Sequence, residues 1–135
     1  MKKFPLLLLL VLAVILGSCA TKVVFPISDM APAAHGTAKV KTDKNNNYQI
    51  DLTIKHLADA DRLNPPKSQY VVWILTEGGV NKNLGGIVSD RSNNAKLSAT
   101  TSFKPIQIFV TAEEAGNVVQ PGRQELFRSK ILRLK

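Results

Sequence analysis

The chain has 135 residues, a formal net charge of +8 at pH 7 and a single cysteine. This length suits one domain with one hydrophobic core, and a lone cysteine excludes an internal disulfide. Basic proteins often meet nucleic acid or anionic surfaces. Here, however, the lysines and arginines are scattered, without the interleaved aromatic residues on which bases stack. We therefore expect a solvated basic surface and no nucleic-acid partner.

The first residues have the three parts of a secretory signal. Lys2 and Lys3 form a basic start, an uncharged apolar run follows over 4–16, and small residues come next. The apolar run is shorter than the roughly 20 residues that a membrane-spanning helix needs. The sequence therefore predicts a signal peptide over 1–18 rather than a permanent anchor helix.

The stretch Leu16-Gly17-Ser18-Cys19 resembles a bacterial lipobox, in which leucine and two small residues precede an invariant cysteine. The resemblance implies a diacylglyceryl group on the Cys19 sulfur, cleavage between Ser18 and Cys19, and acylation of the new amino terminus, for example with palmitate. Two or three chains would anchor the protein stably, whereas one chain anchors only marginally. Ala20, rather than aspartate, favours the outer membrane by analogy with enteric lipoproteins. The expected location is the cell envelope, facing the periplasm or the cell surface; the alternative is an ordinary signal peptide with a chance cysteine.

Residues 19–35 are predicted to be the lipidated cysteine followed by a flexible tether, because they contain prolines and alanines without a sustained hydrophobic period. Fully extended, the tether would reach at most about 50–55 Å at ~3.3 Å per residue. The apolar stretch Val23-Val24-Phe25 can instead pack against the domain, and both alternatives remain open.

From Gly36 onward, alternation of apolar and polar residues predicts antiparallel strands. Two alternating stretches, 37–42 and 48–55, flank an asparagine-rich turn and predict a hairpin with one wet face. The stretch 69–76 is apolar on both faces and rich in β-branched and aromatic side chains, so we expect the most buried strand there.

Further short strands are expected over 80–88, with a kink or bulge at its glycines, and over 96–102, 106–111 and 125–131. Seven or so evenly spaced strands separated by turn signals predict one all-β domain over 36–135. Its expected architecture is an antiparallel, immunoglobulin-like β-sandwich.

The second half of the chain has a recognisable order of features. A tyrosine-x-x-tryptophan strand precedes a leucine-glycine pair, a phenylalanine-x-valine-threonine-x-glutamate strand, a glycine and a proline. The residues are Tyr70, Trp73, Leu84, Gly85, Phe109, Thr111, Glu113, Gly116 and Pro121. This order resembles the extracytoplasmic C-terminal domain of anti-sigma-K factors over roughly residues 36–131. The resemblance implies fold-forming roles, with the tryptophan strand filling the centre of the sandwich.

Anti-sigma-K factors also have a cytoplasmic sigma-binding domain and a membrane-spanning helix, and here a predicted lipid anchor stands in place of both. We therefore expect the anti-sigma activity not to carry over. An interaction or sensing role facing the envelope is what the resemblance implies.

Candidate metal sites are weak. Both histidines, a methionine and a cysteine thiolate would suit a cupredoxin-like copper site, but Cys19 lies outside the domain and is predicted to carry lipid. A site combining His56 with Asp59 or Asp61 is an alternative. His56 continues the buried side of the preceding strand, so we expect instead a hydrogen-bonded histidine at the strand end.

Catalytic residues are not indicated either. The serines lack a strand-to-helix elbow, and two histidines provide few bases. Glu113 and Glu114 are adjacent and would point apart on a strand, and Asp59-Ala60-Asp61 lacks the spacing of a calcium loop. We expect no catalytic residue, metal or cofactor. The predicted function is a non-enzymatic binding module of the cell envelope, attached to the membrane through lipid on Cys19, with another envelope protein as partner. The alternative is an envelope sensor domain that binds a small ligand or metal.

Overall fold

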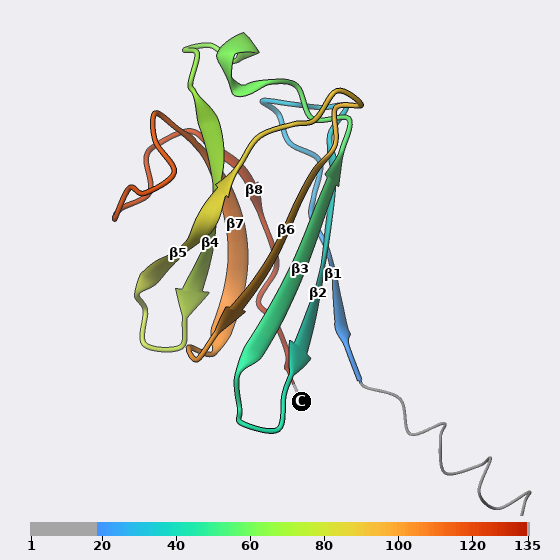
Figure 1. Cartoon of the computed structure of the whole chain (residues 1–135), viewed down its shortest axis with the longest axis vertical. Coiled ribbons are helices and arrows are strands. Elements are labelled where there is room, and N and C mark those ends of the chain that lie inside the picture. The colour runs from blue at the N-terminus through green and yellow to red at the C-terminus, as the bar shows by residue number, and fades with distance from the viewer. Residues whose placement is uncertain (1–18, 135) are drawn as a thin grey trace, which may run out of the picture.

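The computed structural model describes residues 19–134, which form two antiparallel four-stranded sheets packed face to face (Figure 1). The strands are β1 (Thr21–Val24), β2 (His35–Thr42), β3 (Tyr48–Lys55), β4 (Gln69–Thr76), β5 (Asn81–Ile87), β6 (Ala95–Thr101), β7 (Pro105–Glu113) and β8 (Glu125–Arg128), and a short 3-10 helix, η2 (Ala60–Arg62), precedes β4. The predicted all-β sandwich is confirmed. The predicted signal peptide over 1–18 lies outside the described residues. Within 19–134, no helix has the length and apolar character needed to cross a membrane.

The strand order of β2 to β8 is immunoglobulin-like. One sheet has the order β1-β2-β3-β6 and the other β5-β4-β7-β8. Hence β3 lies beside β6, and β7 lies between β4 and β8, as strands B and E, and C, F and G, do in that fold. These are the seven expected strands, and β1 is an additional one.

The prediction of a flexible tether over 20–35 is wrong. β1 pairs with β2 in antiparallel register along its whole length. Val23 and Phe25 are only 5% and 6% exposed, and the Phe25 ring centroid lies 5.6 Å from that of Phe127. In the turn that follows, the buried hydroxyl of Ser28 accepts two backbone amide hydrogen bonds. The alternative in which the apolar stretch packs against the domain is therefore the correct one.

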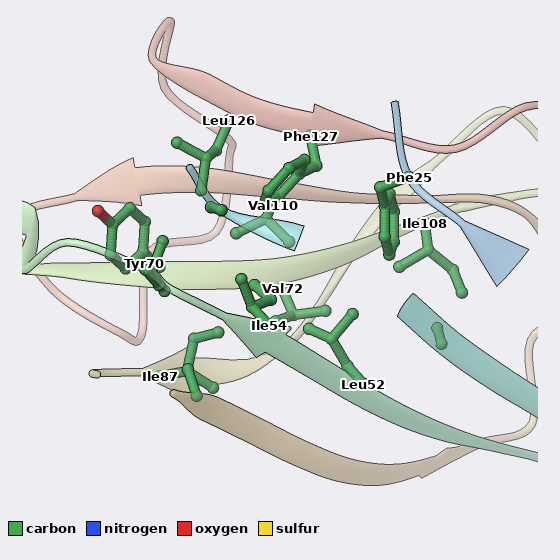
Figure 2. Packing of buried hydrophobic residues seen from close by; sticks show 14 of the residues in the cluster. Phe25, Leu52, Ile54, Tyr70, Val72, Ile87, Ile108, Val110, Leu126 and Phe127 are labelled. Atoms are coloured by element: carbon green, nitrogen blue, oxygen red, sulfur yellow. The ribbon is translucent and has the colours of Figure 1, made fainter. Parts of the chain in front are cut away.

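The core is filled by alternate side chains from both sheets, as the period of two predicts. Figure 2 shows side chains from the two sheets meeting in this layer. Its central members are Leu52, Ile54, Tyr70, Val72, Ile108, Val110 and Phe127. Because both inner faces supply branched and aromatic side chains, the two sheets form one continuous core.

We expect Val23→Ala to lower the free energy of unfolding by about 1–2 kcal/mol, since it removes buried methyl groups. The adjacent Val24 is 66% exposed, so Val24→Ala is the matched control and should change stability by less than about 0.5 kcal/mol. Urea unfolding followed by circular dichroism measures both values. Equal, negligible effects would show that β1 does not stay on the sheet in solution.

Candidate functional site on the outer face of β4 and β7

β4 buries side chains on both of its faces. Alternate residues point into the core, whereas Val71 and Trp73 point outward and form a second cluster with Phe109 of β7. All three are 0% exposed, and Val118 from the 114–124 loop packs against them. Trp73 is buried, as predicted. The inner-facing residues of β4 fill the centre of the sandwich as expected, whereas the Trp73 indole itself lies on the outer face of the sheet.

Trp73 begins a buried hydrogen-bond network. Its Nε1–H donates to Thr111 Oγ1 at 2.8 Å, and the Thr111 hydroxyl donates to Glu113 Oε1 at 2.7 Å. The same carboxylate oxygen accepts the backbone N–H of Gly122 at 2.6 Å. Glu113 is only 8% exposed. The network therefore ties the distal part of the 114–124 loop to the sheet.

Phe109 extends the aromatic cluster toward β8. Its ring is stacked on Trp73 with a centroid distance of 6.1 Å and an interplanar angle of 10°. The Arg128 guanidinium lies 4.0 Å from the Phe109 centroid, a cation–π contact. Arg128 is held there by an ion pair with Glu125 and by a hydrogen bond of 3.1 Å to Gln107 Oε1.

We expect Glu113→Ala to lower the free energy of unfolding by about 1–3 kcal/mol, because it leaves the buried Thr111 hydroxyl and the Gly122 N–H without their acceptor. The neighbouring Glu114 side chain is 69% exposed and pairs with Lys67. Glu114→Ala therefore removes the same charge at a cost below about 1 kcal/mol. Denaturant unfolding of the two variants checks this, and similar losses in both would contradict a structural role for Glu113.

A groove of about 570 Å³ lies beside this network, between β5 and the 114–124 loop. Its lining is partly polar, with Asn81, Lys82, Asn83, Asn117 and Gln120, and partly apolar, with Val80, Leu84, Val118 and Val119. Asn83 Nδ2 donates to Gly116 O at 2.9 Å and to Val118 O at 2.8 Å. One asparagine of β5 thus fixes the loop that forms the other wall.

β5 is kinked where the glycines predict it. The register between β4 and β5 shifts between Val72 and Trp73, and Gly85 has a φ of +145°, a backbone region that favours glycine. A Cβ on Gly86 would lie 3.1 Å from the Cα of Gly116. These glycines therefore let the loop approach the strand closely.

The residues of the anti-sigma-K-like pattern are brought together on this face. Trp73, Phe109, Thr111 and Glu113 form the aromatic and hydrogen-bonded network, and Leu84, Gly85 and Gly116 line the groove. Pro121 precedes Gly122, which closes the network, whereas Tyr70 belongs to the inner core.

Sequence reasoning did not find the roles of Asn83 and Arg128. A polar residue opposite a buried tryptophan was a usable signal for Asn83, which pairs with Trp73 across β4 and β5. No sequence signal would have placed Arg128 over Phe109, because the pairing of β7 with β8 is set by the intervening loop.

Near the start of β4, Tyr70 lies close to the acidic segment that contains Asp59 and Asp61. The Tyr70 hydroxyl donates to Ala58 O at 2.7 Å, and Asp59 Oδ1 accepts the Ser89 hydroxyl at 2.6 Å. Burial, followed by the nearby charges of Asp59 and Asp61, raises the pKa of Tyr70 to about 12. Tyr70, Asp59, Asp61 and Ser89 line a cavity of about 340 Å³.

The raised pKa of Tyr70 predicts an alkaline loss of stability. Tyrosine in an unfolded chain titrates near pH 10, so between about pH 10 and 12 the unfolded state releases a proton that the folded state keeps. The free energy of unfolding therefore falls as pH rises through this window. Tyr70→Phe should remove this part of the decline, as measured by unfolding at a series of pH values. An identical decline in the Tyr70→Phe variant would exclude Tyr70 as its source.

His56 does not occupy the buried position expected for it. Its φ of +56° turns the chain out of the β3 direction, so its side chain is exposed and Leu57 takes the buried place. The two histidines, His35 and His56, are neighbours with ring centroids 6.3 Å apart. Among residues 19–134, no three histidine, cysteine or acidic side chains are grouped so that they could hold a metal ion. The combination of His56 with Asp59 or Asp61 is not assembled.

Cys19 is exposed and lies just before β1. Together with Val40, Thr42 and Leu134 it lines a cavity of about 350 Å³. It therefore lies at the end of the sandwich where β2 ends and the carboxyl-terminal segment arrives.

No protein-family model matches the chain, and no curated protein matches it.

Proposed function

We propose that this protein is a lipid-anchored protein of the cell envelope whose β-sandwich binds another envelope protein in the groove between β5 and the 114–124 loop. The groove itself is the observation that carries this proposal. Val80 and Val119 are 51% and 82% exposed at the groove. The amide side chains of Asn81, Asn117 and Gln120 lie beside them. Apolar contacts next to hydrogen-bonding groups suit a protein surface better than a small, enclosed ligand site.

The wall of the groove is held in place before any partner arrives. Asn83 binds the loop near Gly116 and Val118, and Glu113 binds it at Gly122. A loop fixed at both ends loses little conformational freedom on binding, so more of the contact energy appears as affinity.

The membrane attachment rests on the lipobox-like stretch that ends at Cys19. The exposed position of this cysteine leaves its sulfur accessible for a lipid. The proposed location is the cell envelope, with the outer membrane favoured. The resemblance to the extracytoplasmic domain of anti-sigma-K factors supports an interaction or sensing role.

Site-specific photo-crosslinking in cells tests the binding proposal. A photoreactive residue at Val119 should give a discrete protein adduct, whereas one at Thr100, exposed on the other sheet, should not. The adduct at position 119 should be lost in Asn83→Ala, which releases the loop, while circular dichroism shows that the sheets remain folded. The absence of an adduct, or the same adducts from both positions, would contradict the proposal.

Native mass spectrometry of the purified protein distinguishes the proposed binding module from the alternative, a sensor domain that binds a small ligand or metal. A bound small molecule or metal, with no crosslinked protein, would favour the sensor domain.

A further inference from the structure

The two ends of the sandwich carry different charges. One end, which we call the anchor end, gathers Cys19, three strand-to-strand turns and the carboxyl-terminal segment, at the bottom of Figure 1. Its basic residues are Lys41, Lys44, Lys82, Lys104, Lys130 and Arg133, and its acidic residues are Asp43 and Glu77. At the opposite end, the acidic residues are Asp29, Asp59, Asp61, Asp90, Glu113, Glu114 and Glu125, in slight excess over the basic residues Lys55, Arg62, Lys67, Arg91, Lys96 and Arg123. The molecule is therefore polarised along its strands.

Hydrogen bonds and strand register place these segments at one end. Glu77 N donates to Lys104 O, which joins the β4–β5 and β6–β7 turns. Leu132 N donates to Ile106 O near the start of β7. In the other sheet, Thr42 pairs with Tyr48 at the β2–β3 turn.

The anchor end also exposes large apolar side chains. Phe103 is 47% exposed, and Lys82 Nζ lies 4.5 Å from its ring centroid. Ile131 is 63% exposed. Aromatic and aliphatic side chains interspersed with lysines are typical of surfaces that enter the headgroup region of a bilayer.

The position of Cys19 decides which end meets the membrane. Only Ala20 separates it from Thr21, the first paired residue of β1, so the link spans at most about 7 Å. A lipid on Cys19 would hold the anchor end within reach of the headgroups. This step rests on the lipid anchor of the proposed function.

We propose that the anchor end docks on anionic lipid headgroups, with Phe103 at headgroup depth, so that the strands stand upright and the acidic end points away from the membrane. The competing orientation lays the outer face of the β1-β2-β3-β6 sheet on the bilayer through Lys39, Lys55 and Lys96. That face lacks an exposed aromatic side chain, and Val24 is its exposed large apolar residue. The anchor end has both the charge and the apolar contacts.

Spin-label accessibility in vesicles tests this orientation. The lipid-bearing full chain is purified from membranes and reconstituted into vesicles of phosphatidylcholine, with or without phosphatidylglycerol. A nitroxide is placed on a cysteine introduced at Phe103, at Thr53 on the sheet face or at Ser92 at the acidic end. Cys19 does not react when its sulfur carries lipid.

In anionic vesicles the label at position 103 should collide more with oxygen than with a water-soluble nickel complex, whereas labels at 53 and 92 should show the reverse. High salt should lower the ratio of oxygen to nickel collisions at position 103 toward that of a water-exposed label, since salt screens the headgroup charge. The triple variant Lys44→Gln/Lys130→Gln/Arg133→Gln should do the same. The matched variant Lys39→Gln/Lys55→Gln/Lys96→Gln should leave position 103 unchanged.

Two outcomes would overturn the inference while leaving the lipid anchor intact. A protected label at 53 with an exposed label at 103 would mean that the domain lies on its sheet face. Water exposure at all three positions in attached protein would mean that the domain does not dock. A purified chain without lipid on Cys19 would instead overturn the proposed function on which the inference rests.

Discussion

Trp73→Ala is expected to lower the free energy of unfolding by about 3–5 kcal/mol, the cost of removing a large buried aromatic side chain. Trp73 is 0% exposed and stacked on Phe109. It also donates the hydrogen bond that orients the Thr111 hydroxyl toward Glu113. Urea unfolding followed by circular dichroism measures the loss, because the variant lacks the single tryptophan of the chain.

Trp73→Phe is the informative control for this prediction. It keeps an aromatic ring on Phe109 and loses the N–H that binds Thr111, so its cost should be smaller, about 1–2 kcal/mol. Trp73→Ala should also expose the 114–124 loop to proteases, because the indole supports the Val118 packing. A loss below about 1 kcal/mol in Trp73→Ala would mean that the outer cluster is not packed in solution.

Cys19→Ala is expected to abolish lipid attachment entirely. The sulfur is the predicted site of the diacylglyceryl group, and alanine offers no atom for it. Metabolic labelling with a palmitate analogue should mark the natural chain and not the variant. Intact-mass measurement should find a mature chain that begins at Cys19 and carries lipid, whereas Cys19→Ala retains residues 1–18 or lacks the lipid mass.

Ser18→Ala is the matched control for the anchor. It keeps a small residue before the cleaved bond and should be labelled like the natural chain. An unlipidated mature natural chain would contradict the lipoprotein prediction and favour an ordinary signal peptide.

Alternation of apolar and polar residues was enough to predict the sandwich, because burial of one strand face enforces a period of two. It predicted the β2–β3 hairpin and the central position of β4. It did not predict β1, whose inward-facing contribution lies at Val23 and the following Phe25 within a segment rich in prolines and alanines. Two buried residues are too few to reveal an alternating pattern.

The site was less accessible to sequence reasoning. A strand that is apolar on both faces does not reveal which side chains face the partner sheet, so the sequence predicted that Trp73 is buried but not that it lies on the outer face. His56 was misplaced because its left-handed backbone conformation breaks the strand phase. The groove beside β5 depends on where the 114–124 loop returns. That is decided by the hydrogen bonds of Asn83, which is distant in sequence from the loop, and of Glu113, which precedes it.

The pairing of β1 with β2 also makes the domain resist a force that pulls along β1. If Cys19 is held in a bilayer and a partner pulls at the groove, the load enters the domain at the start of β1 and runs along the strand. The backbone hydrogen bonds of the β1–β2 ladder then share the force in shear instead of opening one after another. The time for which the domain stays folded under such a load is governed by the rate of unfolding. The β1–β2 pairing would therefore set the mechanical stability of this domain.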